Sequence, residues 1–192
     1  MKILLFCLKG FEMLEASPFI DIFGWDRTYN NGDIEVLTCG FNKAVTSTFN
    51  AHLMVDVLID QIKTDDYAAL VIPGGFETYG FYEEAYDNKF LCLIREFNEQ
   101  NKPIASVCVG ALPIGKSGVL KGKNATTYHL MDSNRQKQLA EFGATVINQP
   151  VVVSNNIITS WCPQTATDVA FTLLEKLRSK QDADNVRNIM GY

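Results

Sequence analysis

The sequence predicts a single-domain α/β protein, in which a mostly parallel sheet carries helices on both faces. Two observations favour this class. Short, continuously apolar runs such as residues 3–8 and 68–72 are typical of strands buried on both sides, and amphipathic segments of helical period alternate with them. A length of 192 residues is enough for one such domain with a large core.

The expected elements alternate along the chain. After the strand at 3–8, Ser17 would cap a helix with Pro18 in its first position. Further strands are expected at 34–38, 45–55 (a pair with a turn near Asn50), 68–72, 104–107, 145–147, 151–153 and 157–160. Further helices are expected at 88–100, from 109, at 132–142 before Gly143, and from Pro163. The domain would cover residues 1–180, and a polar tail, 181–192, could dock through Val186, Ile189 and Met190.

Composition limits the possible partners. A net charge of −5, with no cluster of lysine and arginine, argues against nucleic-acid binding. The chain contains no apolar run near the ~20 residues of a membrane span, and its start lacks the pattern of a secretory leader. We therefore expect a cytoplasmic protein that does not bind a membrane, and the charge excludes neither a small-molecule ligand nor a protein partner.

Five cysteines, at positions 7, 39, 92, 108 and 162, are an odd number without metal-type spacing. The two histidines, His52 and His129, are far apart in the sequence. We expect reduced thiols, no metal and no cofactor.

Cys108 is the strongest candidate for a reactive residue. It follows the predicted strand 104–107 and precedes a segment that reads as a helix, with Gly110 two residues later. This arrangement is typical of a nucleophile elbow, in which backbone N–H groups and a helix N-terminus favour the thiolate. A buried core cysteine is the alternative from local sequence alone.

Other candidates follow neighbouring strands, whose carboxyl ends form the usual ligand edge of a parallel sheet. Glu15 lies among apolar residues, so partial burial would raise its pKa and allow it to donate a hydrogen bond to a thiolate. Gly74 and Gly75 could offer N–H groups to an oxyanion or form an ordinary turn. His129 and Cys162 precede predicted helices, and Cys162 could border the same pocket.

Five segments together resemble the ThiJ/PfpI family of the class I glutamine amidotransferase-like superfamily, which includes the parkinsonism-associated protein deglycase. The segments are Gly10-Phe-Glu-Met-Leu-Glu15, Val71-Ile-Pro-Gly-Gly75, Ala105-Ser-Val-Cys-Val-Gly-Ala111, Lys121-Gly-Lys-Asn-Ala-Thr-Thr127 and Asn156-Ile-Ile-Thr-Ser-Trp-Cys-Pro-Gln-Thr-Ala166. They occur in family order over roughly residues 3–177. The resemblance implies a flavodoxin-like sandwich that is usually a homodimer.

The resemblance also implies roles for single residues. It places the nucleophile on Cys108, its acidic partner on Glu15, a histidine on His129 and oxyanion donors on the N–H groups of Gly75 and Val109. Three positions depart from the family pattern. Val109 replaces the histidine of the peptidase branch, Tyr128 interrupts the usual Thr-Thr-His, and Trp161-Cys162 precedes Pro163 where many relatives have Gly-Pro. Trp161 would form an aromatic wall where some relatives place an arginine, so the pocket would be more apolar than theirs.

The leading functional hypothesis is an enzyme of glyoxalase or deglycase type, in which Cys108 adds to a reactive carbonyl with the help of Glu15 or His129. Isocyanide-hydratase-like chemistry would suit the Trp161 wall, although that branch usually has aspartate where this chain has Glu15. Amidase chemistry ranks third. A non-enzymatic alternative is a redox or stress sensor that uses oxidation of Cys108 without turnover. A second non-enzymatic alternative is a protein of this family that acts only through its dimer surface.

Overall fold

The computed structural model describes residues 1–132 and 134–192. Ser133, inside the helix expected at 132–142, lies outside the described residues. Among those described, the central sheet has seven strands in the order β10-β11-β7-β6-β1-β2-β5. Their bounds are β1 Lys2–Phe6, β2 Glu35–Gly40, β5 Val57–Leu58, β6 Ala69–Ile72, β7 Ile104–Ser106, β10 Val151–Ser154 and β11 Ile157–Ser160. Only β10 and β11 pair antiparallel within this described sheet, so the predicted mostly parallel sheet is confirmed.

Two smaller pairs lie outside the central sheet. The strand pair expected at 45–55 is the antiparallel hairpin of β3 (Ala44–Thr46) and β4 (His52–Met54). The strand expected near 145–147 is β9 (Thr145–Val146), which pairs with β8 (Asn124–Ala125) beside the main sheet. Strands β5 and β8 were not predicted, because two-residue strands carry too little sequence pattern to be recognised.

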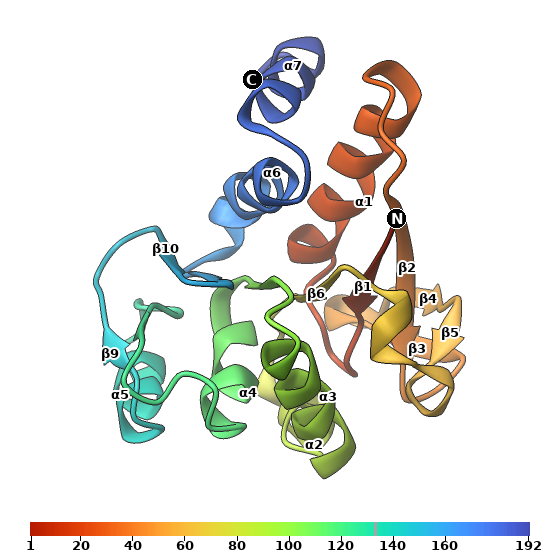
Figure 1. Cartoon of the computed structure of the whole chain (residues 1–192). Helices are drawn as coiled ribbons and strands as arrows, with labels where there is room; N and C mark the ends of the chain where they lie inside the picture. Colours follow the sequence, from red (N-terminus) through yellow and green to blue (C-terminus); the bar gives the residue numbers. More distant parts are fainter. Residues whose placement is uncertain (133) are drawn as a thin grey trace.

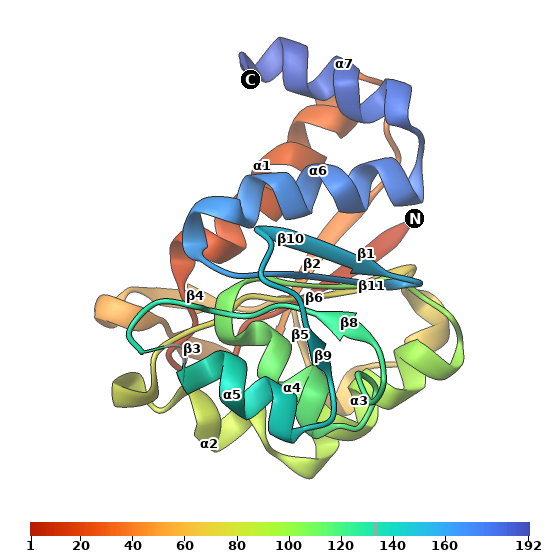
Figure 2. The same ribbon diagram turned by 90° about the vertical axis from the view of Figure 1, so that its left-hand side faces the viewer.

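Helices cover both faces of the sheet, as predicted (Figures 1 and 2). On one face lie α1 (Met13–Tyr29) and α6 (Ala166–Leu177), with α7 (Lys180–Met190) stacked on their outer side. On the other face lie α2 (Phe81–Ala85), α3 (Asn88–Glu99), α4 (Ala111–Lys116) and α5 (Asn134–Glu141). The predicted stripe of α3 is confirmed, since Phe90, Leu93, Ile94 and Phe97 are all buried.

The start of α1 differs from the prediction. The helix begins at Met13 and contains Pro18, although a proline normally marks a first helical turn. The Glu12 carbonyl accepts the first hydrogen bonds, from the N–H groups of Glu15 and Ala16. Pro18 removes one internal bond, but burial of Phe19, Ile22 and Phe23 outweighs that loss. The earlier start carries Glu15 on the helix rather than in a loop.

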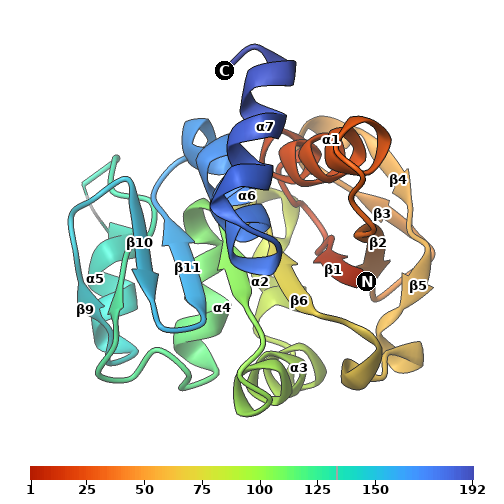
Figure 3. The ribbon, with the colours of Figure 1, turned by 45° about the horizontal axis from the view of Figure 1, so that its top comes forward.

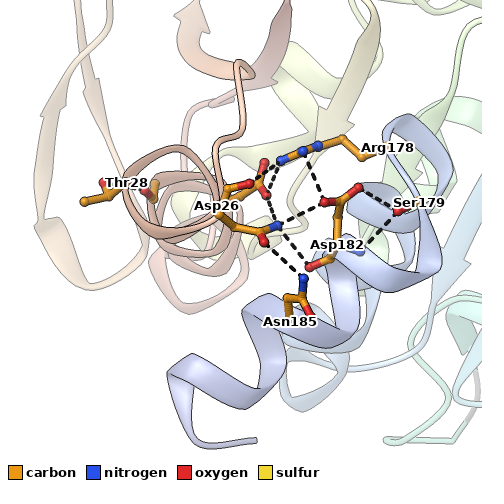
Figure 4. Close-up of polar contacts among 8 residues, drawn as sticks. Asp26, Thr28, Arg178, Ser179, Asp182 and Asn185 are labelled. Atoms are coloured by element: carbon orange, nitrogen blue, oxygen red, sulfur yellow. Dashed lines mark hydrogen bonds and ion pairs between the residues drawn. The ribbon is translucent and has the colours of Figure 1, made fainter.

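The segment expected to be a polar tail forms α7 and packs on α6 and α1 (Figure 3). Val186 is buried in this contact and Met190 packs against the core, whereas Ile189 stays exposed. The connection between α6 and α7 is held by Arg178, whose guanidinium lies 2.6 Å from the buried carboxylate of Asp26 on α1 (Figure 4). Asp182 also pairs with Arg178, at 3.1 Å.

Candidate active site

Cys108 occupies a sharp turn after β7, as the sequence predicted. Its φ is 54°, in the left-handed region that a non-glycine residue adopts only under constraint. A short 3₁₀ turn, Cys108–Gly110, leads from there into α4. Gly110 is required at this turn, because a Cβ there would lie 2.3 Å from the Ile72 carbonyl oxygen. The Thr127 hydroxyl donates to the Cys108 carbonyl at 2.8 Å and fixes the turn from a separate segment.

Glu15 lies in the first turn of α1 and is 1% exposed. Its carboxylate oxygen Oε2 accepts the N–H of Gly74 at 2.5 Å, and the carboxyl group also hydrogen-bonds the Cys108 side chain. Burial raises the pKa of Glu15 from 4.5 to about 8, and these two hydrogen bonds lower it only in part. The carboxyl is therefore mostly protonated at neutral pH, as the sequence analysis expected.

The Cys108 thiol does not follow the sequence-based expectation of a favoured thiolate. Burial and the neighbouring Glu15 carboxyl raise its pKa well above the ordinary value, while the N–H of Val109, which hydrogen-bonds the sulfur, lowers it. The helix that follows, α4, is only 6 residues long, so its N-terminus offers limited stabilisation. Burial therefore favours the protonated form of both Cys108 and Glu15 in the folded protein.

The double glycine serves two purposes. The N–H of Gly74 supports Glu15, so it positions the acid rather than binding a substrate oxygen. Gly75 lines the cleft above Cys108, and its backbone passes so close to Gly10 that a Cβ would lie 2.2 Å from the Gly10 carbonyl oxygen. Of the two expected glycine donors, Gly75 is the one that borders the cleft.

The cleft over Cys108 has a volume of about 810 Å³ and mainly apolar walls. Trp161 forms part of the wall, as predicted, and its ring stacks on that of His129 with centroids 4.0 Å apart. Cys162 also lines the cleft, so the expectation that it borders this pocket is confirmed. The remaining apolar wall residues come from several segments: Leu14, Phe76, Tyr82, Val109, Tyr128, Leu130, Met131 and Pro163.

The imidazole of His129 contacts the second thiol of the cleft. Its Nδ1 lies 3.4 Å from the sulfur of Cys162. Burial raises the pKa of the Cys162 thiol, and a hydrogen bond from the His129 backbone opposes that rise. Tyr128 stands before His129 where relatives have Thr-Thr-His, and the imidazole contacts both Cys162 and the Trp161 ring.

Tyr82 and Arg135 are among the residues of the cleft that were not predicted from the sequence. Tyr82 comes from α2, a helix that was not predicted, and Arg135 comes from the first turn of α5. The Arg135 guanidinium lies over the Tyr82 ring, 4.8 Å from its centroid, and pairs with Glu77 at 2.7 Å. The sequence shows no motif around either residue, since their approach to Cys108 depends on how α2 and α5 pack.

The three remaining cysteines lie outside the cleft. Cys7 and Cys39 are buried in the core, and Cys92 is exposed on α3. Within the described part of the chain, no group of three or more His, Cys, Asp or Glu side chains could hold a metal ion. Residues 1–132 and 134–192 also include no helix that is long and apolar enough to cross a membrane.

The sheet order, the helices on both faces and the cysteine on its elbow define a flavodoxin-like α/β protein. The chain belongs to the DJ-1/PfpI family, whose profile matches residues 1–176. The resemblance inferred from the five sequence segments is thereby confirmed.

Individual relatives agree with this assignment. The protein DJ-1 homolog B of Arabidopsis thaliana is 29% identical over 181 residues, which cover 94% of this chain and 39% of the relative. The chain thus spans about two fifths of the length of that relative. Drosophila melanogaster DJ-1beta superimposes with a TM-score of 0.86 at 25% identity, over 98% of this chain and 96% of the other. Schizosaccharomyces pombe DJ-1 superimposes with a TM-score of 0.84 at 26% identity, over 100% of both chains.

Proposed function

We propose that the protein is a cysteine-dependent enzyme acting on small reactive carbonyl compounds, in the manner of a glyoxalase or deglycase. The observation that carries this proposal is the buried pair of Cys108 and Glu15 at the floor of a cleft. A carboxyl with a pKa of about 8 exchanges protons readily near neutral pH, which is the property required of a general acid and base.

The first step would be addition of Cys108 to an aldehyde. About a tenth of Glu15 is ionised one pH unit below its pKa, and this fraction accepts the thiol proton as the sulfur bonds to the carbonyl carbon. The proton then passes to the former carbonyl oxygen, giving a hemithioacetal. The N–H groups of Gly75 and Val109 would stabilise the negative charge that develops on this oxygen.

A 2-oxoaldehyde could then be converted to a 2-hydroxy acid. Glu15 or His129 removes the proton from the hemithioacetal carbon and returns a proton to the neighbouring carbon, leaving a thioester on Cys108. Water cleaves the thioester, which releases the hydroxy acid and restores the thiol. The net reaction adds one water and needs no external oxidant or reductant.

Turnover of methylglyoxal to lactate tests this proposal. We expect Cys108→Ser to abolish turnover and Glu15→Gln to reduce it by a factor of ~100 or more, the usual contribution of an acid–base group. Cys92→Ser, on the exposed side of α3, is the matched control for loss of a thiol. Turnover that survives Cys108→Ser would disprove the role of this thiol, and a complete lack of turnover in the unaltered protein would leave the redox sensor as the better hypothesis.

The size and apolar walls of the cleft favour one second candidate, the hydration of an isocyanide. A cleft of about 810 Å³ is larger than a 2-oxoaldehyde needs, and Trp161 offers a flat apolar surface to an alkyl or aryl group. Formation of an N-formamide from an alkyl isocyanide, dependent on Cys108, would favour this reaction over carbonyl chemistry.

We further propose that the protein forms a homodimer, as the family resemblance implied. Phe49, Phe76 and Tyr79 form an aromatic cluster beside the β3–β4 hairpin, with ring centroids 5.8–6.5 Å apart. Phe49 is 69% exposed, which is unusual for a ring within an apolar cluster. Sedimentation equilibrium should give twice the chain mass, and Phe49→Asp should shift it toward the monomer. A monomer at all concentrations would contradict this proposal.

A further inference from the structure

A second thiol stands in the same cleft as Cys108 and has no part in the carbonyl reaction proposed above. Cys162 is 7% exposed and lies just after β11. Its sulfur is 3.4 Å from Nδ1 of His129, whose ring is held by stacking on Trp161. A thiol placed against an imidazole is a typical arrangement for a nucleophile with its base.

The two thiols also follow neighbouring strands. Strands β7 and β11 are paired in parallel, with Ser106 opposite Thr159. Cys108 comes two residues after Ser106, and Cys162 comes three residues after Thr159. Neighbouring strands run about 4.8 Å apart, and the Cα atoms of a disulfide are separated by about 4.4–6.8 Å. Charge on Cys162 raises the pKa of Cys108, which agrees with two sulfurs in proximity.

We propose that Cys162 is a resolving thiol, so that the cleft reduces hydroperoxides through a reversible Cys108–Cys162 disulfide. This inference goes beyond the carbonyl chemistry and does not depend on it. The substrate class is a hydroperoxide, and the electron donor that restores the thiols is a small or protein dithiol.

The first step oxidises Cys108. Ionised Glu15 accepts the thiol proton, and the sulfur attacks the terminal oxygen of the hydroperoxide, the one that carries hydrogen. The O–O bond breaks, the sulfur loses two electrons to become a sulfenic acid, and the leaving alkoxide takes a proton from Glu15 to become an alcohol. Glu15 ends the step in the state in which it began.

The second step uses Cys162 and His129, which contact each other. His129 accepts the Cys162 thiol proton, and the resulting thiolate attacks the Cys108 sulfur. An S–S bond forms, the S–O bond breaks, and the departing hydroxide takes the proton from His129 and leaves as water. Two thiol–disulfide exchanges with an external dithiol restore both cysteines. Without Cys162, a second peroxide would convert the sulfenic acid to a sulfinic acid, which dithiols do not reverse.

Mass spectrometry of the peroxide-treated protein tests the proposal. The protein is treated with cumene hydroperoxide at equimolar and moderate excess, alkylated to block remaining thiols, and digested without reductant. The unaltered protein should lose two hydrogen atoms in intact mass and yield linked peptides containing Cys108 and Cys162. Dithiothreitol should restore both thiols. Cys162→Ser should instead accumulate two oxygen atoms on Cys108, resistant to dithiothreitol.

Two further variants separate the chemical roles. His129→Asn should slow formation of the disulfide at least tenfold, so that the sulfenic acid trapped by dimedone persists longer than in the unaltered protein. Cys92→Ser is the control for an exposed thiol and should behave as the unaltered protein does. The proposal is overturned if Cys108 in the unaltered protein passes to sulfinic acid as fast as in Cys162→Ser, or if the disulfides formed join two chains. Disulfide mapping in the unaltered protein decides the matter even where a variant folds poorly.

Discussion

Replacement of Glu15 by glutamine should make the stability of the protein less sensitive to pH. Glutamine matches glutamate in size, and its side-chain oxygen can still accept the Gly74 N–H, so the packing of the site is retained. What the substitution removes is a buried carboxyl whose pKa rises from 4.5 to about 8 on folding.

The sign follows from proton linkage. Between these two pKa values the unfolded chain releases the Glu15 proton, while the folded protein keeps it. Folding therefore takes up a proton, and the free energy of unfolding falls as pH rises through this window. The loss is about 1.4 kcal/mol for each pH unit, or at most about 5 kcal/mol across the window from 4.5 to about 8.

Urea unfolding of the two proteins at several pH values between about 5 and about 8 measures the effect. The stability of Glu15→Gln relative to the unaltered protein should increase steadily over this range. Asp21→Asn, on the exposed side of the same helix, corrects for the loss of one negative charge. A difference that is the same at both ends of the range would refute the reasoning, because it would mean that Glu15 titrates alike in the folded and unfolded states.

Three further outcomes follow from described contacts. Cys108 should be alkylated by iodoacetamide more slowly than the exposed Cys92 near pH 8, because burial raises the pKa of the Cys108 thiol. Peptide mass spectrometry after timed quenching measures both rates, and faster alkylation of Cys108 would contradict this expectation. Arg178→Met should destabilise the protein by about 3–5 kcal/mol, because it leaves the buried Asp26 charge without its cation. Lys180→Met, at an exposed ion pair, should leave the stability measured by chemical denaturation nearly unchanged. Gly110→Ala should lower the melting temperature and abolish turnover together, since a Cβ would press on the Ile72 oxygen, and an active protein of unaltered stability would argue against this account of the turn.

The strands and the elbow were predictable because their signals are local. Residues 68–72 are apolar without interruption, residues 104–107 are apolar apart from Ser106, and the turn at Cys108 has its glycine at the required distance. The pattern of α3 was equally clear, since its buried side chains repeat at helical spacing.

The start of α1 was predicted wrongly because a local rule was overridden by packing. Proline disfavours a helix interior, yet the apolar face of α1 is buried against the sheet and α6, and this burial decides where the helix begins. The direction of the Cys108 pKa was wrong for a similar reason. A sequence shows the turn that favours a thiolate but not the extent of the burial that opposes it.

The rest of the cleft depends on contacts between distant segments. Tyr82 and Arg135 reach it through the packing of α2 and α5, and neither carries a motif of its own. The contact between His129 and Cys162 joins residues 33 positions apart. Both residues were singled out from the sequence, but their pairing depends on how the segment after β8 packs against β11, where the Thr126 N–H donates to the Thr159 hydroxyl.

The ion pair between Asp26 and Arg178 has a consequence for synthesis of the chain on the ribosome. Its two residues are 152 positions apart, so the first helix is made long before the guanidinium that neutralises its carboxylate exists. Until then, burial of Asp26 against the sheet would leave a charge in an apolar setting without a counterion. The nascent first helix therefore has reason to stay hydrated until Arg178 has been synthesised, so closure of that face of the sheet follows synthesis of α6 and its connection to α7.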